Sequence, residues 1–226
     1  NVVTSAGTTS YSASYGSEFW TGTVTASPLT FTATTTSVGA PIWKSDTVLE
    51  TQFASNNRVV VTWNSATDAG IPFRIANLPA AAKTALDTAF VTGDDSSNYL
   101  NYLRGDKTHE VNSTSAGSLK IYRDRKAPLG DVVNSKLTLS AAPRMPYSDG
   151  NNPGYAAFKS TTASRTPLVL FGANDGMLHA LNGTTSGADM GKEVFAYVPA
   201  ATFTGPNGNA ATDGLAALGN PSYAHR

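Results

Sequence analysis

The chain has 226 residues with 16 Lys and Arg against 16 Asp and Glu, so its formal net charge is zero. This balance supplies none of the basic field that nucleic-acid binding needs, and we expect no nucleic-acid partner. The absence of cysteine excludes a disulfide scaffold and a cysteine-based zinc site. The apolar run 168–171 is far shorter than the roughly 20 residues of a membrane span.

The first 75 residues have the alternation of apolar and polar side chains that is typical of β-strands. We expect four strands there, over 10–15, 19–26, 29–35 and 58–63. Residues 41–53 are compatible either with a short helix or with a packed irregular connection.

A helical insertion is predicted near residues 77–105. Asn77 is the expected cap of a first helix with its body over 79–90. A second, shorter helix begins at Ser96 or Ser97 and ends at Gly105.

The strongest local pattern lies in the last third of the chain. After a candidate strand over 132–141, residues 166–173 and 177–182 predict two strands joined by the tight turn Asn174-Asp175-Gly176. Gly accepts the positive φ that such a turn demands. With a third strand over 193–198, this makes a meander, which predicts one blade of a β-propeller over 166–198. The fold class is therefore mainly β, and we expect another strand to occupy the blade's open edge.

The sequence over 168–182, with Gly-Ala-Asn-Asp-Gly at its centre, and Phe-Ala-Tyr-Val-Pro at 195–199, resemble the PilY/PilC family of type IV pilus biogenesis factors and tip-associated adhesins. Asn-Tyr-Leu-Arg-Gly-Asp at 101–106 and the segments at 122–125 and 129–135 stand in the same order as in that family. The resemblance implies that residues 1–226 form the first part of a modified, quinoprotein-like β-propeller. The rest of the propeller would come from missing sequence or another chain.

The same resemblance implies a non-enzymatic protein at the cell surface or pilus tip, exported through the periplasm. Its implied roles are pilus extension, surface attachment and twitching motility. Its implied partners are major or minor pilins and a host receptor or surface. Calcium is the implied metal, but the nearest candidate loop, 149–154, lacks a third acidic ligand and a distal Glu, so we expect the calcium ligands beyond Arg226.

Two alternatives remain open. One is a quinone-dependent dehydrogenase, whose blades look similar, although one blade and no cysteine argue against it. The other is a carbohydrate-binding propeller, in which Tyr147 and Tyr155 would stack on sugars. We expect no catalytic residue in this chain.

Two charged motifs need separate interpretation. Arg104-Gly105-Asp106 is an integrin-type tripeptide and a candidate receptor-binding motif, although a helix end followed by a surface turn accounts for it as well. Residues 123–130 are expected to form an extended connector, because Pro128 disfavours helix on its N-terminal side. Asp131 with Arg123 and Arg125 is expected to form buried ion pairs that fix the strand entering the propeller.

Two further residues are expected to have structural roles. His179 alternates within an apolar strand, where a packed or hydrogen-bonded imidazole is the default. Asp175 is explained by its turn.

Overall fold

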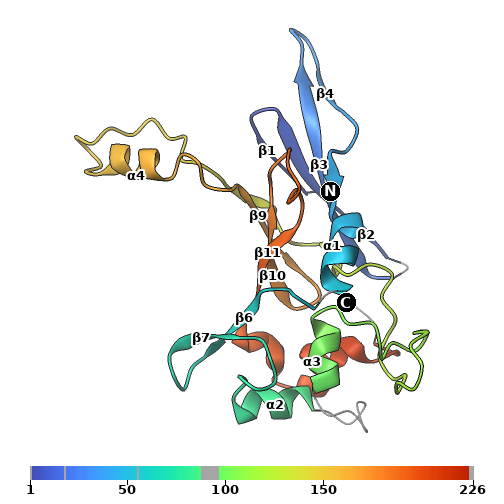
Figure 1. Cartoon of the computed structure of the whole chain (residues 1–226). Helices are drawn as coiled ribbons and strands as arrows, with labels where there is room; N and C mark the ends of the chain where they lie inside the picture. Colours follow the sequence, from blue (N-terminus) through green and yellow to red (C-terminus); the bar gives the residue numbers. More distant parts are fainter. Residues whose placement is uncertain (1, 18, 55, 88–96, 224–226) are drawn as a thin grey trace.

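The protein is mainly β and contains two sheets. The computed structural model describes residues 2–17, 19–54, 56–87 and 97–223 (Figure 1). The first sheet has the order β1-β2-β3-β4, with β5 added on β3, and all its pairings are antiparallel. Its strands are β1 (Val2–Ala6), β2 (Thr9–Gly16), β3 (Thr21–Phe31), β4 (Thr36–Val38) and β5 (Trp43–Lys44).

The second sheet has six strands in the order β7-β6-β11-β10-β9-β8. Strands β8 to β11 follow one another as an antiparallel meander, whereas β6 joins β11 in parallel. Their bounds are β6 (Val60–Asn64), β7 (Ala69–Pro72), β8 (Thr138–Ser140), β9 (Leu168–Ala173), β10 (Met177–Asn182) and β11 (Glu193–Val198). Strands of this chain therefore cover both edges of the predicted three-stranded blade.

The predicted hairpin is confirmed, and its turn is Asn174-Asp175-Gly176 as expected. Ala173 pairs with Met177, so the connection has three residues, and Gly176 adopts a φ of 84°. A three-residue hairpin loop needs one left-handed residue, which Gly supplies without steric cost. The candidate strand over 132–141 is wrong in extent, because only Thr138–Ser140 pairs with β9.

The amino-terminal strands differ from prediction at one proline. The two strands expected over 19–26 and 29–35 are one strand, β3, which runs through Pro28. Pro28 faces Thr9 where the pairing with β2 ends, a position at which a missing N–H is tolerated. The ambiguous range 41–53 contains β5 followed directly by helix α1 (Ser45–Ala54).

The helical insertion is confirmed in position but not in its first cap. Helix α2 (Ala80–Leu86) has Pro79 as its N-cap without a side-chain hydrogen bond, so the expected cap at Asn77 is wrong. The end of the predicted first helix falls on residues 88–96, outside the described residues. Helix α3 (Ser97–Leu103) is as predicted. The other helices among the described residues are α4 (Tyr155–Thr161), η2 (Ala200–Phe203), α5 (Ala210–Asp213) and η3 (Leu215–Gly219).

Two apolar cores lie on the same face of the second sheet. Cross-strand pairing puts Val169 beside Leu181 and Phe171 beside His179, and these residues share one face. At one end of this face, Leu181 packs with the first sheet and α1; at the other, Met177 packs with α2, α3 and the carboxyl-terminal 3-10 turns. His179, between them on β10, marks the position of a polar cluster.

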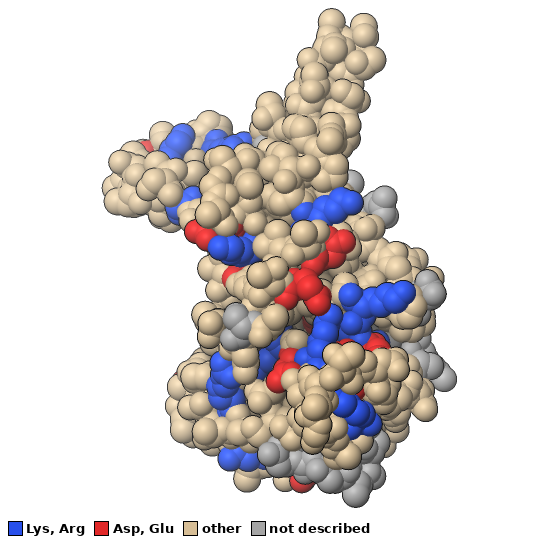
Figure 2. Space-filling model, turned by 45° about the vertical axis from the view of Figure 1, so that its right-hand side comes forward, with Lys and Arg blue, Asp and Glu red and all other residues tan. Residues whose placement is uncertain are grey.

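Two segments project from this body (Figure 1). The β3–β4 hairpin extends beyond the ends of β1 and β2, and residues 19–43 contain no charged side chain. The space-filling view accordingly shows a projection without charge above a body whose charged groups gather around its middle (Figure 2). The other projection carries α4, which buries no residue, and leaves the sheet between Ser140 and Leu168.

Candidate functional site

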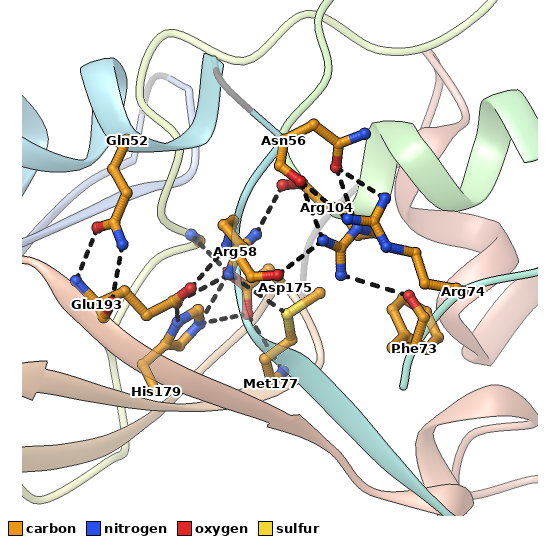
Figure 3. A network of polar contacts seen from close by, with 11 residues as sticks. Gln52, Asn56, Arg58, Phe73, Arg74, Arg104, Asp175, Met177, His179 and Glu193 are labelled. Carbon is orange, nitrogen blue, oxygen red and sulfur yellow. Dashed lines mark hydrogen bonds and ion pairs between the residues drawn. The ribbon is translucent and has the colours of Figure 1, made fainter. Parts of the chain in front are cut away.

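A buried network of four charged side chains lies between the two cores (Figure 3). The guanidinium of Arg58 grips the carboxylate of Glu193 with two hydrogen bonds, Nε to Oε2 at 2.7 Å and Nη2 to Oε1 at 2.8 Å. His179 lies 2.8 Å from Glu193 through Nδ1 and 3.0 Å from an Asp175 oxygen through Nε2. The chain Arg58–Glu193–His179–Asp175 therefore alternates in charge and is neutral as a whole when His179 is protonated.

Each member of the network comes from a different element. Glu193 is the first residue of β11, His179 lies within β10, Asp175 lies in the β9–β10 turn, and Arg58 precedes β6. The pairing of β10 with β11 is irregular between Ala180 and Leu181, where the register shifts. This bulge changes which residue of β11 faces the core beyond it, as bulges generally do.

Helix α1 fixes the position of Glu193 through hydrogen bonds from a helix side chain to the Glu193 backbone. The amide of Gln52 donates to the Glu193 carbonyl and accepts from the Glu193 N–H, each at 2.8 Å. This paired contact imitates a strand partner at the start of β11, so α1 helps to position the carboxylate that Arg58 binds.

Arg104 forms a second tier that joins the network to α3. Its Nη2 donates to the Arg58 carbonyl at 2.8 Å, while Arg58 Nη1 donates to the Arg104 carbonyl at 3.0 Å. Arg104 also donates to the Phe73 carbonyl and to the side chain of Asn56. The two arginines thus hold each other's backbone, although the burial of Arg104 and the charges of Arg74 and Arg58 lower its pKa to about 10.

Burial works against these charges, and the partners outweigh it. Burial alone would lower the pKa of His179, but Asp175 and Glu193 raise it to about 9. Burial would raise the pKa of Glu193, whereas Arg58 and His179 lower it to about 2. The pKa of Asp175 is likewise lowered, since the effect of His179 and Arg58 exceeds that of burial. At neutral pH His179, Glu193 and Asp175 are therefore all charged.

Aromatic and sulfur groups form the walls of the network. Arg58 lies over the Phe53 ring at 3.6 Å from its centroid, and His179 stacks on Phe171 with ring centroids 5.4 Å apart. Arg58 Nη2 also lies 3.7 Å from the sulfur of Met177. His179 has no exposed surface and its two ring nitrogens are both engaged, so the arrangement is suited to holding elements together and not to proton transfer with a substrate.

The connector before β8 touches the network at its turn. Gly130 donates its N–H to Asp175 at 3.3 Å, and Gly22 of β3 donates to the Leu129 carbonyl at 3.1 Å. A Cβ on Gly130 would lie 2.5 Å from the Asp175 backbone nitrogen. The close contact of the first sheet, the connector and the β9–β10 turn is therefore possible only because residue 130 has no side chain.

We expect Gly130→Ala to lower the free energy of unfolding by about 1–3 kcal/mol, because the added methyl group must displace backbone. Denaturant unfolding of the variant chain checks this. Gly150→Ala is the matched control, since its Cβ would meet no atom closer than 3.9 Å. Equal losses in both variants would contradict the steric explanation.

The structure separates the residues of the Arg104-Gly105-Asp106 motif. Arg104 is 1 % exposed and directed into the protein, whereas Asp106 is half-buried and accepts a hydrogen bond from the Thr108 N–H. Gly105 adopts a φ of 112° at the end of α3, so it serves as the helix stop. Receptor binding by this motif stays a prediction, and the burial of Arg104 gives it no support.

The turn Asn174-Asp175-Gly176 does more than reverse the chain. Asp175 accepts from the Met177 N–H within the turn, as its sequence pattern predicts. It also binds His179, and Asn174 donates to Asp131 at 2.8 Å. The purely local explanation of Asp175 is therefore incomplete, while the packed and hydrogen-bonded imidazole expected for His179 is confirmed.

The expected ion pairs of the connector need correction. Arg125 forms a largely buried pair with Glu110 at 2.7 Å and not with Asp131, and it covers the ring of Tyr102. Arg123 donates to the Leu218 carbonyl at 3.0 Å. Asp131, which is 1 % exposed, accepts from Asn174 as described above, so it joins the connector to the blade through an amide.

The described residues give little support to a metal site or to a sugar-binding surface. Within residues 2–17, 19–54, 56–87 and 97–223, no group of three or more His, Asp or Glu side chains, the buried network included, is arranged so that it could hold a metal ion. Asp149, the acidic residue of the nearest calcium-like loop, accepts from the Ala156 N–H at 2.8 Å instead. Tyr147 and Tyr155 do come together, but edge to face, with centroids 5.3 Å apart.

A polar cavity of about 500 Å³ lies beside the network. It is bordered by the end of α1, the turn at Asp106 and the loop over 112–115, with Glu50, Lys107 and Asp124 among its lining residues. Two of these, Lys107 and Glu50, form an exposed ion pair.

Comparison with known proteins identifies the family. The chain is 38 % identical over 157 residues to a type IV pilus biogenesis factor PilY1 homolog of Xylella fastidiosa, covering 61 % of this chain and 12 % of the relative. It is 30 % identical over 211 residues to the type IV pilus biogenesis factor PilY1 of Pseudomonas aeruginosa strain PAK, covering 85 % of this chain and 16 % of the relative.

The chain belongs to the PilY1 family. It spans less than a fifth of the length of the curated relatives it matches. No family model and no solved structure matches it. Among the described residues of this PilY1-family segment, no helix combines the length and hydrophobicity of a membrane span.

Sequence reasoning found only half of the network. The sequence patterns assign roles to His179 and Asp175 but none to Arg58 and Glu193, because each of these lies at the edge of a predicted strand and far from the other in sequence. The one available signal was a charged residue directly beside an apolar strand in a chain with only 14 % charged residues.

Proposed function

We propose that this chain is a structural, non-enzymatic part of a type IV pilus biogenesis factor that promotes pilus extension, surface attachment and twitching motility. The similarity to PilY1 proteins over 211 residues carries the proposal. The buried network supports it, because its charged groups are occupied with one another and offer no reactive group to a substrate.

The segment forms the first part of a modified β-propeller in this proposal. The antiparallel meander β8 to β11 has the four strands of a propeller blade. The face opposite His179 carries Leu178 at 37 % exposure beside the partly buried Tyr197, an apolar surface suited to packing on a neighbouring blade. The missing blades belong to the rest of the polypeptide or to another chain.

The remaining family expectations enter as proposals of the same kind. The protein acts at the cell surface or pilus tip after export, with pilins as partners and a surface or host receptor as a further contact. Calcium, where the protein uses it, binds outside this segment, because the carboxylate of Asp149 accepts a hydrogen bond from the backbone at the start of α4.

A segment exchange tests the proposal. The matching region of P. aeruginosa PilY1 is replaced by these residues in cells that lack their own PilY1. We expect the chimera to restore surface pili and twitching, measured as sheared pilin and as the twitching zone. The same chimera with Arg58→Met should accumulate poorly and restore little.

Lys192→Met serves as the matched control because Lys192 is exposed and adjoins Glu193. A chimera that accumulates normally yet restores no pili would contradict the proposal. A purified protein that binds a quinone and oxidises alcohols would favour the dehydrogenase alternative.

A further inference from the structure

The chain contains two Asn-x-Thr tripeptides that no part of the proposed function uses. They are Asn112-Ser113-Thr114 and Asn182-Gly183-Thr184. This pattern is the acceptor for asparagine-linked glycosylation in exported proteins, but a match is meaningful only on an accessible loop. The structure distinguishes the two.

The first tripeptide lies on an exposed loop. Asn112 and Thr114 are exposed and Ser113 is half-buried, and the exposed residues continue to Gly117. The loop is anchored at its start by hydrogen bonds from the Val111 N–H to the Tyr122 carbonyl and from the Ser113 N–H to the Glu110 carbonyl. The side chains of 112–117 therefore contribute nothing to either core, and a large group attached there displaces no packed residue.

The second tripeptide lies within the blade. Asn182 is the last residue of β10 and is 9 % exposed, and its side-chain oxygen accepts from both the N–H and the hydroxyl of Thr184. Gly183 packs against Val169 and donates to the Pro167 carbonyl. An enzyme cannot reach this asparagine while the sheet is formed.

We propose that Asn112 is a glycosylation site, modified by an asparagine oligosaccharyltransferase that uses a lipid-linked oligosaccharide. The inference rests on the export that the proposed function entails. In the transfer, the amide nitrogen of Asn112 bonds to the anomeric carbon of the sugar, and the bond from that carbon to the lipid diphosphate breaks. The lipid diphosphate leaves, and one amide proton passes to a base of the enzyme.

The surroundings of Asn112 accommodate the product. The Asn112 amide nitrogen donates to Asp124, and the Asn112 backbone N–H donates to the same carboxylate at 3.0 Å. A substituted amide keeps one N–H, so the contact with Asp124 survives modification. Since Asn112 also borders the polar cavity beside Asp106, the glycan would stand over the Arg104-Gly105-Asp106 turn and limit access to it.

Peptide mass analysis tests the site. The whole 226-residue chain, with an added export leader, is produced in bacteria that carry such a transferase and its lipid-linked oligosaccharide. Trypsin cuts after Lys107 and Lys120, so peptide 108–120 contains Asn112 alone, while peptide 166–192 contains Asn182. We expect a mass increase of one oligosaccharide on peptide 108–120 and none on peptide 166–192.

Two exposed hydroxyl residues provide matched variants. Thr114→Val removes the acceptor pattern and should abolish the mass increase, whereas Ser115→Ala beside it should leave the increase unchanged. An unmodified peptide 108–120 in cells that glycosylate a reporter acceptor overturns the proposal, as does equal modification of both peptides. The leader supplies export, so this outcome is independent of whether the segment supports pili.

Discussion

Replacing Arg58 with methionine lowers the free energy of unfolding of the chain by about 3–5 kcal/mol, the expected result of removing one partner from a buried ion pair. The side chains of Arg58 and Glu193 are only 2 % and 1 % exposed, so water cannot take the place of the guanidinium. Glu193 and Asp175 would then share the single positive charge of His179. Denaturant unfolding followed by circular dichroism measures the loss.

A matched control separates burial from charge. Lys192→Met removes an ion pair with Asp189 whose side chains are 45 % and 74 % exposed, and we expect a loss below about 1 kcal/mol. Adding Glu193→Met to Arg58→Met should cost less than the sum of the two single changes, because the second change then removes a carboxylate that has already lost its Arg58 partner. A loss below about 1 kcal/mol for Arg58→Met alone would show that the network contributes little.

Raising the pH from 6.5 to above 9 lowers the free energy of unfolding by about 3 kcal/mol through His179 alone. The folded state raises the pKa of His179 from 6.5 to about 9, so the folded chain holds this proton more tightly than the unfolded chain. The stabilisation is complete below pH 6.5 and disappears as the pH rises through 9. Chemical unfolding at a series of pH values measures it.

Glu193 produces the opposite slope in acid. Its pKa falls from 4.5 to about 2 on folding, so its stabilisation is present above pH 4.5 and is lost as the pH falls through 2. The combined contribution of Glu193 and His179 to stability is therefore greatest between about pH 4.5 and 6.5.

Two histidine variants identify the source of the alkaline slope. His109→Gln should keep it, because His109 is only partly buried and bonds the Leu119 carbonyl. His179→Gln should remove it along with much of the stability. An unchanged free energy between pH 6.5 and 9 in the unaltered chain would mean that folding does not raise the pKa of His179.

Local patterns predicted much of the second sheet. The alternating strands and the Asp-Gly turn act over a few residues, so β9, β10 and β11 could be placed from sequence. The same holds for α3, which ends at Gly105 with a φ of 112°. Pro28 wrongly indicated a break between two strands. A proline is tolerated within β3 because the pairing with β2 ends there, and where that pairing ends is not a local property of the sequence.

The candidate site could not be predicted in the same way. Arg58 and Glu193 are 135 residues apart in sequence, and their contact depends on the parallel pairing of β6 with β11. A parallel pair leaves no turn pattern in the sequence. The Arg104-Gly105-Asp106 pattern is compatible both with receptor binding and with a helix end, and it carries no sign that Arg104 is buried. That burial follows from the packing of α3 on the sheet.

The projection that carries α4 can change in length and sequence without changing the blade. Ser140 and Leu168 face each other across β8 and β9, so the segment between them leaves the blade and returns to nearly the same point. Its length enters the stability only through the slowly growing entropy of closing a loop. Evolution can lengthen, shorten or re-sequence this segment while the blade and its charges stay fixed, so relatives can diversify here at little cost to folding.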